Sequence, residues 1–404
     1  MKYNKVNLAI IFDQVLRTGG GYQQALNNVM SMTQSKSKAH YVPKIFTIYP
    51  ENIAILGNYG LKVELIKVSK FGRVWLKIRS LIYSSLLLKL MGPNEFEKKL
   101  VNHEIDLVYF LSPSGWSNYL ESLNYIITIW DSCHRDFPEF PEVYENRVFE
   151  TRERNYSRFL ARAVAVISDS KLGKDNIIRR YNIDESRVHV LPFSPAYAVQ
   201  TASINHINDV KNRFKIEKDY IFYPAQFWAH KNHVYVLQGL KALKIEYNLI
   251  IDVVFSGGNA GNLKYIRDLT AALDLSSQVH FLGFVDNDDV VNLYKSAIAL
   301  VMPTYFGPTN LPPLEAFTLG VPVLYSDLPG LRDQVGDSAL LMDLSNPSSM
   351  SKHIYNLIND PNLRLKLIES GKKRISSLNE DNHQKVVESI CFDFKVKMNC
   401  WRGL

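Results

Sequence analysis

Short apolar runs alternate with amphipathic stretches along both halves of the chain. In the first half the apolar runs read VNLAIIF, YVPKIFTI, IDLVYFL, YIITIWD, AVAVISDS and RVHVLPF. From Tyr220 onward they read YIFYPAQ, NLIIDVVFSGG, VHFLGFV, AIALVMPT, VPVLYSD and SALLMD. Short apolar runs bounded by turn residues are typical of buried strands, and strands that alternate with helices form parallel sheets covered on both faces. The pattern therefore predicts an α/β protein.

The length of the chain and one polar interruption predict two such domains. A single hydrophobic core stops growing at about 250–300 residues, whereas the chain has 404. The stretch FSPAYAVQTASINHINDV, residues 193–210, is poor in apolar residues and typical of a linker. We therefore predict a Rossmann-like domain over 1–197, a linker over 198–210, a second Rossmann-like domain over 211–378, and a helical tail over 379–404 that is able to pack back on the first domain. Two such domains would face a central cleft, where ligands commonly bind.

The composition excludes several classes of protein. With 46% hydrophobic and 22% charged residues it is ordinary for a soluble globular protein. Cys133, Cys391 and Cys400 are odd in number and lack C-x-x-C spacing, which favours a reducing compartment without a disulfide framework or a zinc site. No run approaches the ~20 apolar residues needed to cross a bilayer, and the apolar run near the start is too short for the core of a signal peptide. We therefore expect a cytoplasmic protein.

The basic residues are distributed unevenly, although the net charge of +7 is modest for this length. The stretch KVSKFGRVWLKIRSLIYSSLLLKLMG, residues 67–92, contains six Lys or Arg and no acidic residue. Apolar residues recur there at helical spacing beside a basic face: Phe71, Trp75, Ile78 and Ile82 on one side, and Lys70, Arg73 and Lys77 on the other. Two interpretations stay open, a helix that lies in the interface of an anionic membrane and an ordinary domain helix that packs inward. Nucleic acid does not fit as a partner, because the basic charge is local and no recognised binding motif is present.

The stretch YFGPTNLPPLEAFTLGVPV, from Tyr305 to Val323, predicts a tight loop and then a helix. Asn310 is a good N-cap, two prolines are tolerated in a first turn, and Gly320 suits the end of the helix. Because the loop follows a buried strand, it lies where open α/β sheets hold their ligands. The N–H groups of such a loop and the helix dipole suit a diphosphate, and the carboxylate of Glu315 is able to accept both hydroxyls of a ribose.

Three further strand ends carry residues suited to the same ligand. The stretch YPAQFWAHKNH contains Lys231 and Asn232 at a helix start, where a lysine acts as a positive charge on phosphate oxygens. The glycine-rich stretch FSGGNAGN contains Gly257, and the stretch FLGFV with Phe284 is able to hold a base by backbone contacts. Each residue also has a plain structural interpretation: a solvated lysine, an ordinary helix start, or a carboxylate that complements a helix dipole.

The sequence does not predict a metal centre. His230 and His233 flank Lys231 but lack the remaining ligands of a metal site, so we interpret them as structural residues or as donors near a phosphate. The DNDD stretch at 286–289 begins a helical segment and fits helix capping better than ion binding.

These motifs resemble the retaining nucleotide-sugar glycosyltransferases of family four, which have the GT-B architecture. The resemblance rests on KN and GFV after two strands, on PPLEAFTLGVPV and on SDLPGLRDQVGDSALLMD, and covers residues 220–375. In the first half it rests more loosely on the glycine turn at 19–21, on ITIWDSCHRDFPEFPE and on AVISDS. It implies transfer of a sugar from a nucleoside diphosphate, with retention of configuration, to an acceptor on the first domain. The donor site that it implies consists of Gly20, Gly21, Gln226, Lys231, Asn232, Gly257, Phe284, Gly307, Pro308, Thr309, Asn310, Leu311 and Glu315.

The chain departs from the family pattern at two positions. Gln226 stands where the family usually has an arginine five residues before the lysine. The family commonly carries two glutamates separated by seven residues; Glu315 matches the second, which typically binds the donor ribose, and Gly307 stands in place of the first. Because the first glutamate often contacts the transferred sugar, Thr309 and Asn310 would have to supply such contacts here.

The resemblance also points to a catalytic pair in the first half. Many relatives read His-Asp at a strand end, and this chain has Trp130-Asp131 followed by His134. Asp131 is able to accept a hydrogen bond from a sugar hydroxyl, and His134 to orient the acceptor or a donor phosphate, although both could simply hold a long loop together. Lys231 and Glu315 complete the expected catalytic set, in which the loop and the lysine stabilise the departing diphosphate. The expected mechanism requires no metal and no other cofactor.

Other activities stay open at this point. A nucleotide-sugar epimerase uses the same architecture, and the substitutions at Gly307 and Gln226 also fit a nucleotide-sugar-binding protein without catalysis. A pyridoxal phosphate-dependent phosphorylase fits less well, because the chain is short and has no clear Schiff-base lysine motif. The nucleotide, the sugar and the linkage are not specified, but the basic segment suggests a lipid-linked glycan acceptor, as in the synthesis of bacterial O-antigen or capsule.

Overall fold

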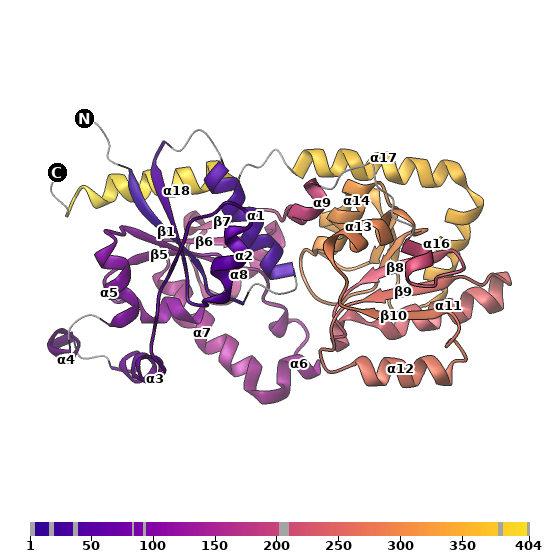
Figure 1. Cartoon of the computed structure of the whole chain (residues 1–404), viewed down its shortest axis with the longest axis horizontal. Coiled ribbons are helices and arrows are strands. Elements are labelled where there is room, and N and C mark those ends of the chain that lie inside the picture. The colour runs from indigo at the N-terminus through magenta and orange to yellow at the C-terminus, as the bar shows by residue number, and fades with distance from the viewer. Residues whose placement is uncertain are drawn as a thin grey trace. The chain divides into compact units, whose positions relative to one another are not determined.

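The computed structural model describes residues 5–15, 20–34, 39–82, 85–91, 94–201, 210–378 and 383–401. The chain forms two compact units (Figure 1). The first unit comprises Met1–Ser132, Phe149–Pro192 and Asp381–Leu404, and the second comprises Cys133–Val148 and Phe193–Glu380. Gly19, residues 202–209 of the predicted linker and residues 379–382 at the start of the predicted tail lie outside the described residues.

The first unit is built on a parallel sheet that has seven strands within the residues described. The strands are β1 (Val6–Phe12), β2 (Tyr41–Thr47), β3 (Val63–Leu65), β4 (Leu107–Phe110), β5 (Asn124–Ile129), β6 (Ala165–Ser168) and β7 (Val188–Val190). Their order is β3-β2-β1-β4-β5-β6-β7, and each neighbouring pair is parallel. The order reverses between β1 and β4, which makes this the switch point at which open α/β sheets bind ligands.

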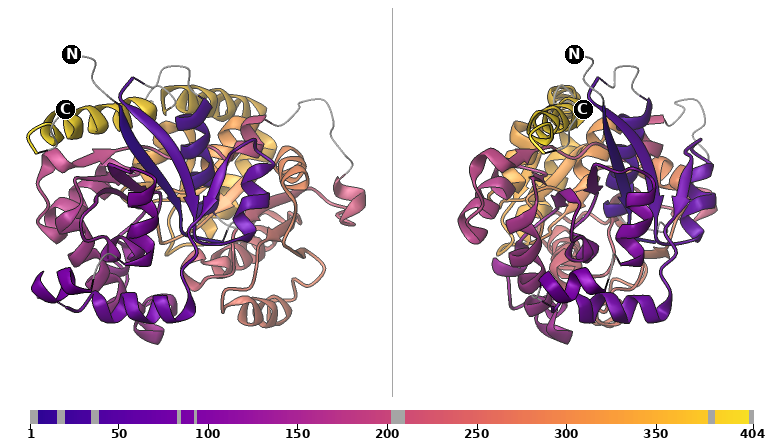
Figure 2. Two further views of the ribbon diagram at one scale, coloured as in Figure 1. Left: turned by 60° about the vertical axis from the view of Figure 1, so that its left-hand side comes forward. Right: turned by 90° about the vertical axis from the view of Figure 1, so that its left-hand side faces the viewer.

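Helices of the first unit connect these strands. They are α1 (Gly20–Gln34), α2 (Glu51–Gly57), α3 (Lys70–Arg79), α4 (Ser85–Leu90), α5 (Glu95–Asn102), α7 (Val148–Arg162) and α8 (Lys171–Tyr181). The terminal helix α18 (His383–Met398) packs against α1 (Figure 2). Its Glu388 carboxylate accepts the backbone N–H groups of Ala39 and His40 at 2.9 and 2.8 Å. The terminal helix is therefore held to the first unit by polar contacts as well as by packing.

The second unit contains a parallel sheet with six strands in the described part of the chain. The strands are β8 (Tyr220–Pro224), β9 (Asp252–Ser256), β10 (Val279–Gly283), β11 (Leu300–Met302), β12 (Val323–Ser326) and β13 (Leu340–Met342). Their order is β10-β9-β8-β11-β12-β13, again parallel throughout. The order reverses between β8 and β11, so the loops that follow these two strands flank the switch point of the sheet.

The longer helices of the second unit follow its strands. They are α11 (His233–Tyr247), α12 (Leu263–Ala272), α13 (Asn287–Lys295), α14 (Leu311–Leu319), α16 (Ser348–Asn359) and α17 (Pro361–Leu378). Shorter helices are α6 (Pro141–Tyr144), α9 (Tyr197–Thr201), α10 (Val210–Arg213) and α15 (Leu331–Val335). The predicted capping role of the DNDD stretch is confirmed, because the Asp286 side chain accepts the N–H of Asp289 at 3.0 Å and so begins α13.

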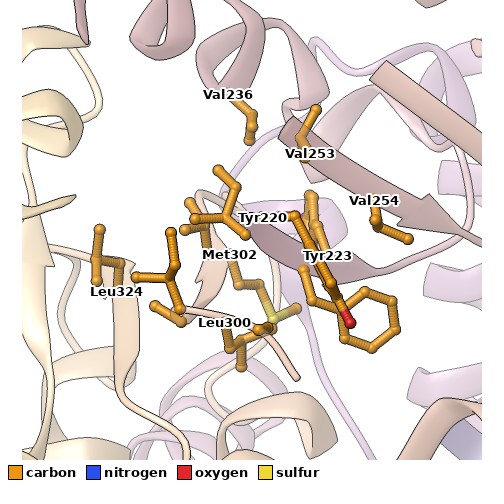
Figure 3. Close-up of a cluster of buried hydrophobic side chains, with 14 of the residues drawn as sticks. Tyr220, Tyr223, Val236, Val253, Val254, Leu300, Met302 and Leu324 are labelled. Carbon is orange, nitrogen blue, oxygen red and sulfur yellow. The ribbon is translucent and has the colours of Figure 1, made fainter. Parts of the chain in front are cut away.

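The strands of the second unit are continuous apolar runs because both faces of the sheet are covered. Figure 3 shows the centre of this core, where Tyr220 and Tyr223 of β8 lie beside Val253 of β9 and Leu300 of β11. These four side chains are fully buried. Burying one Val or Leu side chain stabilises a fold by about 1.5–3 kcal/mol. The sheet that carries the switch point therefore rests on a large apolar core.

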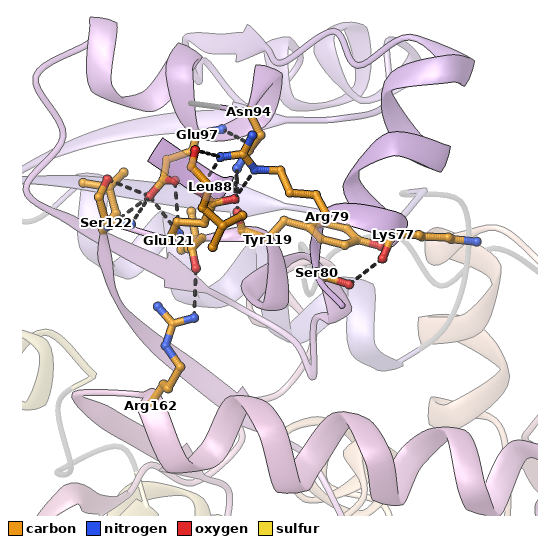
Figure 4. A network of polar contacts seen from close by, with 12 residues as sticks. Lys77, Arg79, Ser80, Leu88, Asn94, Glu97, Tyr119, Glu121, Ser122 and Arg162 are labelled. Atoms are coloured by element: carbon orange, nitrogen blue, oxygen red, sulfur yellow. Dashed lines mark hydrogen bonds and ion pairs between the residues drawn. The ribbon is translucent and has the colours of Figure 1, made fainter. Parts of the chain in front are cut away.

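A buried polar network anchors α3 and α4 in the first unit (Figure 4). The Glu97 carboxylate accepts the backbone N–H groups of Glu121 and Ser122. Arg79, only 3% exposed, donates through Nη2 to Glu121 Oε2 at 2.8 Å and to the carbonyl of Leu88 at 3.3 Å. A buried charge needs such partners to offset its desolvation, so this network fixes the end of α3.

The predicted fold class is confirmed, since both units are Rossmann-like α/β structures with parallel sheets. None of the helices formed by the described residues has the length and apolar character needed to cross a bilayer.

Candidate functional site

The loops after β8 and β11 bring two of the predicted site residues into contact. Lys231 Nζ donates a hydrogen bond to Asn310 Oδ1 at 3.1 Å. Lys231 ends a short 3-10 turn (Ala229–Lys231), and the Tyr223 hydroxyl donates to its backbone carbonyl at 2.7 Å. The next residue, Asn232, adopts a left-handed conformation with φ 54°, and its side chain accepts the N–H of Tyr235 at 3.3 Å, which begins α11. The ammonium group is therefore presented from a well-fixed turn.

Asn310 is the N-cap residue of α14, as predicted, but its side chain does not cap the helix. Its Nδ2 donates instead to the Tyr325 hydroxyl at 2.7 Å and to the Phe306 carbonyl at 3.2 Å. Its backbone N–H donates to Gln334 Oε1 at 2.9 Å, and Gln334 Nε2 donates to the carbonyl of Asn310. Asn310 is thus held on all sides, and its Oδ1 is directed to Lys231.

The start of α14 offers few backbone donors. Pro312 and Pro313 have no N–H group, and the N–H of Asn310 is engaged by Gln334. Within the described residues the N–H of Leu311 has no hydrogen-bond partner. An anion at this helix end would therefore meet the Leu311 N–H, the ammonium of Lys231 and the positive end of the helix dipole.

Gly307 has a conformation that other residues adopt only under strain. Its φ is 96°, and a Cβ placed there would lie 2.7 Å from the carbonyl oxygen of Thr309 and 3.0 Å from Asn310 Nδ2. Its N–H donates to Cys133 Sγ at 3.3 Å. Pro308, which follows it, is buried. The absence of a glutamate at position 307 thus has a local reason, because this turn has no room for one.

Glu315 faces the interior of the second unit. It is 9% exposed, and the hydroxyl of Tyr294, from α13, donates to its Oε2 at 2.8 Å. Burial raises the pKa of Glu315 to about 7, while the Tyr294 hydrogen bond opposes that shift. Oε1 of Glu315 has no hydrogen-bond partner among the residues described. One carboxylate oxygen is therefore fixed and the other is available to a ligand hydroxyl.

The remaining predicted residues of the second unit lie at the same edge of the sheet. Gln226 Oε1 accepts the indole N–H of Trp228 at 3.0 Å, so the side chain that replaces an arginine is held by its neighbour. Gly257 follows β9, and a Cβ there would lie 2.2 Å from the carbonyl oxygen of Ala225, so only glycine permits this close approach. Phe284 follows β10 and is 70% exposed.

The residues predicted in the first half of the chain lie at the start of α1 and after β5. Gly20 and Gly21 open α1, and a Cβ at Gly21 would lie 2.4 Å from Cη2 of Trp130. Asp131 forms a bidentate ion pair with Arg152 at 3.2 and 3.4 Å. His134 is completely buried in a 3-10 turn that belongs to the second unit.

Sequence reasoning missed Asp13 at the carboxyl end of β1. Its Oδ1 accepts the hydroxyl of Ser112, which follows β4, at 2.7 Å. Burial raises the pKa of Asp13, although the hydroxyls of Ser112 and Ser114 oppose the shift. The aspartate directly follows the apolar run VNLAIIF, so its place at a strand end was the available signal.

Sequence reasoning also missed an aromatic cluster around the site. Phe140 lies near Tyr305 and Phe306 at ring-centroid distances of 5.5 and 5.3 Å, and the His230 ring stacks on Phe306 at 4.1 Å. Phe140 belongs to the stretch FPEFPE, and its ring partners lie 165 and 166 positions away in the sequence, so a local pattern could not identify them. No group of three or more His, Cys, Asp or Glu suited to a metal ion occurs among the described residues.

Two family profiles match the chain. The profile described as "Glycosyl transferases group 1" matches residues 206–374, and the profile described as "Glycosyltransferase Family 4" matches residues 67–193. Together the two ranges cover 296 of the 404 residues, and β1, β2 and β3 of the first unit lie outside them.

Curated relatives match about half of the chain. The O-antigen chain mannosyltransferase B of Escherichia coli is 24% identical over 225 residues, which are 55% of this chain and 59% of that protein. The O-antigen chain mannosyltransferase RfbU of Salmonella typhimurium is 27% identical over 210 residues, 51% of this chain and 55% of that protein. The chain thus matches less than two thirds of the length of these relatives.

Solved structures match nearly the whole chain at low identity. A glycosyltransferase from Rickettsia africae has a TM-score of 0.69 at 12% identity, covering 97% of this chain and 99% of that one. Anabaena HepE in complex with UDP-glucose has a TM-score of 0.68 at 14% identity, covering 96% and 98%. WaaG, a glycosyltransferase involved in lipopolysaccharide biosynthesis, has a TM-score of 0.67 at 14% identity, covering 95% and 99%. At such identities these structures establish the fold.

Proposed function

The chain belongs to the family-4 glycosyltransferases of GT-B architecture, and on this premise we propose that it transfers a sugar from a nucleoside diphosphate donor to a glycan or lipid-linked acceptor. The relatives that are O-antigen mannosyltransferases, and WaaG among the structural neighbours, favour a hexose donor and a role in the synthesis of lipopolysaccharide or a similar bacterial surface polysaccharide. Transfer with retention of configuration is part of the proposal.

The contact between Lys231 and Asn310 is the observation that supports this proposal most directly. It joins the loops on the two sides of the switch point, at the start of α14. A diphosphate that binds there would be stabilised by the ammonium charge, by the Leu311 N–H and by the helix dipole. Charge on the departing diphosphate is the main charge that develops during transfer, so a preorganised cationic site lowers the barrier.

Glu315 fits a role in binding the donor ribose. The Tyr294 hydroxyl holds Oε2, and Oε1 has no partner within the described part of the chain. A ribose hydroxyl that donates to Oε1 would place the nucleoside at the carboxyl edge of the sheet. Phe284, exposed beyond β10 at the same edge, is proposed to contact the base. Gln226, Asn232, Gly257, Pro308 and Thr309 complete the donor site in this proposal.

In the proposed reaction the bond between the anomeric carbon and the β-phosphate oxygen breaks. A bond from the acceptor oxygen forms on the same face, and the acceptor proton passes to the released diphosphate. Asp131 and His134 are proposed to orient the acceptor, and Gly20 and Gly21 to approach the donor through their backbone. In this mechanism Lys231 supplies the positive charge at the leaving group, and no metal ion or other cofactor is invoked.

Calorimetry followed by turnover assays tests the proposal. Titration with UDP, GDP and ADP identifies the nucleotide, and the matching nucleotide sugars are then incubated with and without lipid-linked glycan acceptors. We expect one diphosphate to bind and its sugar to be transferred only when acceptor is present. Conversion of the donor sugar without acceptor would indicate an epimerase, and failure of all three diphosphates to bind would contradict the proposal.

The proposal includes contact with an anionic membrane, at the inner face of the cytoplasmic membrane, through α3. The face of α3 that packs inward consists of Gly72, Leu76 and Arg79. The remaining apolar residues of α3 therefore point outward: Phe71 is 89% exposed, and Val74, Trp75 and Ile78 are between 49% and 57% exposed. Exposed apolar side chains gathered on one helix are typical of an interaction surface.

The charges around this face favour an anionic lipid surface. Lys70, Arg73 and Lys77 are exposed, and none forms an ion pair within the described residues. Each basic residue near an anionic membrane contributes about 1 kcal/mol. Replacing all three by Ala should therefore release the protein from phosphatidylglycerol vesicles in co-sedimentation, whereas replacing the exposed residues Lys241, Lys244 and Lys366 should not. Equal binding by both triple variants would exclude this surface.

A further inference from the structure

A segment between β5 and α7 belongs to the second unit and carries a buried carboxylate to the candidate site. The segment is Cys133–Val148, and its short helix α6 (Pro141–Tyr144) begins with a proline. Glu142 lies in the first turn of α6, with its side chain 10% exposed. A carboxylate at such a depth requires compensating donors.

The Glu142 carboxylate has two hydrogen bonds of this kind, and both are made by His230. The backbone N–H of His230 donates to Glu142 Oε1 at 2.9 Å, and its ring Nδ1 is hydrogen-bonded to the same oxygen. Burial opposes ionisation of the carboxyl group, but the hydrogen bonds from His230 lower the pKa of Glu142 below its ordinary value. Because an ionised carboxylate only accepts hydrogen bonds, Nδ1 of His230 carries the hydrogen and donates a hydrogen bond to Glu142.

His230 connects the two loops that form the candidate site. It directly precedes Lys231 in the loop after β8, and its carbonyl accepts the N–H of Tyr305 from the loop after β11 at 2.9 Å. Its ring stacks on Phe306, with centroids 4.1 Å apart and planes inclined by 14°. Phe306 in turn precedes Gly307. His230, which is hydrogen-bonded to Glu142, therefore directly precedes Lys231. Its ring is stacked on Phe306, the residue before Gly307.

We propose that Glu142 is a positioning residue for the donor diphosphate, acting through His230 on the loops that carry Lys231 and Gly307. By accepting both donors of His230, Glu142 fixes the backbone turn and the ring orientation at once. The turn sets the direction of Lys231 toward Asn310, and the ring supports Phe306 and the turn at Gly307. The inference rests on the proposed function, because it assigns Glu142 to the binding of that donor.

Calorimetric titration of the full chain with a nucleoside diphosphate and with the matching monophosphate tests this role. UDP, GDP and ADP are titrated first to find the nucleotide that wild type binds. For Glu142→Ala we expect the affinity for the diphosphate to fall by about tenfold or more, and the affinity for the monophosphate by about threefold or less, because in the proposed complex Lys231 and the start of α14 would contact the terminal phosphate. Glu142→Gln keeps an acceptor oxygen and should recover part of the diphosphate affinity.

Controls separate positioning from general loss of structure. Glu139→Gln changes an exposed carboxylate of the same segment and should leave both affinities within about twofold of wild type. His230→Asn should repeat the loss of diphosphate preference, and thermal unfolding of each variant reports whether it is folded. If Glu142→Ala and His230→Asn bind the diphosphate as wild type does, or lose both nucleotides equally, the positioning role is refuted. If wild type binds no diphosphate, the proposed function fails and this inference fails with it.

Discussion

Lys231 and Asn310 are 79 positions apart in the sequence, and their side chains are joined by a hydrogen bond of 3.1 Å. The contact brings an ammonium group to the N-terminal end of α14. Asn310 is able to hold that group because its other polar atoms are bound by Tyr325, Phe306 and Gln334. The position of the cation is therefore fixed before any ligand binds, which is a requirement for electrostatic stabilisation of a leaving group.

Lys231→Ala should lower turnover at least tenfold, which corresponds to about 1.4 kcal/mol of transition-state stabilisation. The change removes the ammonium group that contacts Asn310 but leaves the other hydrogen bonds of Asn310 in place. Steady-state kinetics with the identified donor measures the effect. Lys244→Ala, which removes an exposed lysine from α11, serves as the control and should leave turnover unchanged. Equal turnover rates for the two variants would show that Lys231 does not stabilise the departing diphosphate.

Gly307→Glu should not improve the enzyme, although it restores the residue that the family spacing places there. With φ at 96° and a Cβ only 2.7 Å from the carbonyl of Thr309, any side chain strains the turn. Such strain costs on the order of 1–3 kcal/mol, so we expect a lower midpoint of thermal unfolding and weaker donor binding.

Gly258→Ala is the matched control for position 307. A Cβ at Gly258 meets no atom within 4 Å, and the residue has no positive φ. The free energy of unfolding of Gly258→Ala should remain within about 0.5 kcal/mol of the wild-type value. A stable and more active Gly307→Glu variant would show that the turn rearranges readily and that the family glutamate is tolerated.

The sequence predicted those parts of the site that depend on local physics. The buried strands before the loops follow from apolar runs, and Gly320 ends α14 with φ 71°, as its position suggested. Asn310 was predicted as an N-cap from the same local rules. Its side chain nevertheless binds Lys231 and Tyr325 rather than the helix, because tertiary partners compete successfully for a polar side chain at a helix start.

The partners that hold the site could not be predicted, because they come from distant segments. Gln334 lies 24 positions from Asn310, and Glu142 lies 88 positions from His230. Nothing in a local pattern of apolar and polar residues encodes such pairs. The buried face of α3 could not be predicted for a related reason: periodicity identifies an apolar stripe, but only the packing of Gly72 and Leu76 determines which stripe is buried.

His134→Asn should lower turnover more than it lowers donor affinity. The proposed role of His134 is to orient the acceptor, so its loss should affect the chemical step at saturating donor. Because His134 is completely buried, its replacement could also unfold the protein, so the midpoint of thermal unfolding of the variant is measured beside its kinetics. His103→Asn, a more exposed histidine of the first unit, is the control. A loss confined to donor binding would place His134 in the donor site instead.

Gly21→Ala should destabilise the first unit. The added methyl group would lie 2.4 Å from Cη2 of Trp130, and overpacking of this kind typically costs about 1–3 kcal/mol. The comparison is Gly57→Ala at the end of α2, where a Cβ meets nothing within 4 Å. That variant should be at least as stable as wild type, because alanine favours a helix over glycine. Chemical denaturation of both variants would reveal the difference, and identical curves would mean that Trp130 moves aside.

Glu315 should make the stability of the protein depend on pH. Burial raises its pKa from an ordinary value of 4.5 to about 7, against the effect of the Tyr294 hydrogen bond. Between these two values the folded state binds the proton more tightly than the unfolded state, so stability falls as pH rises. The stabilisation is complete below pH 4.5 and is lost as pH rises through about 7, with a difference of about 3 kcal/mol. Subtracting the unfolding free energy of Glu315→Gln, which has no carboxyl proton, isolates this contribution at each pH.

Donor affinity should change with pH in the opposite direction. A ribose hydroxyl donates to the carboxylate of Glu315, so the ionised form of Glu315 is the form that binds the ribose. Burial makes this ionised form the less stable one in the free protein. Wild type should therefore bind the nucleoside diphosphate more tightly as pH rises through about 7, the value set by burial of Glu315. Titrating Glu315→Gln under the same conditions corrects for ionisation of the ligand phosphates, because both proteins receive the same ligand. If the two proteins show the same change of affinity with pH, the ribose does not bind to Glu315, and the nucleoside must be held elsewhere along the edge of the sheet.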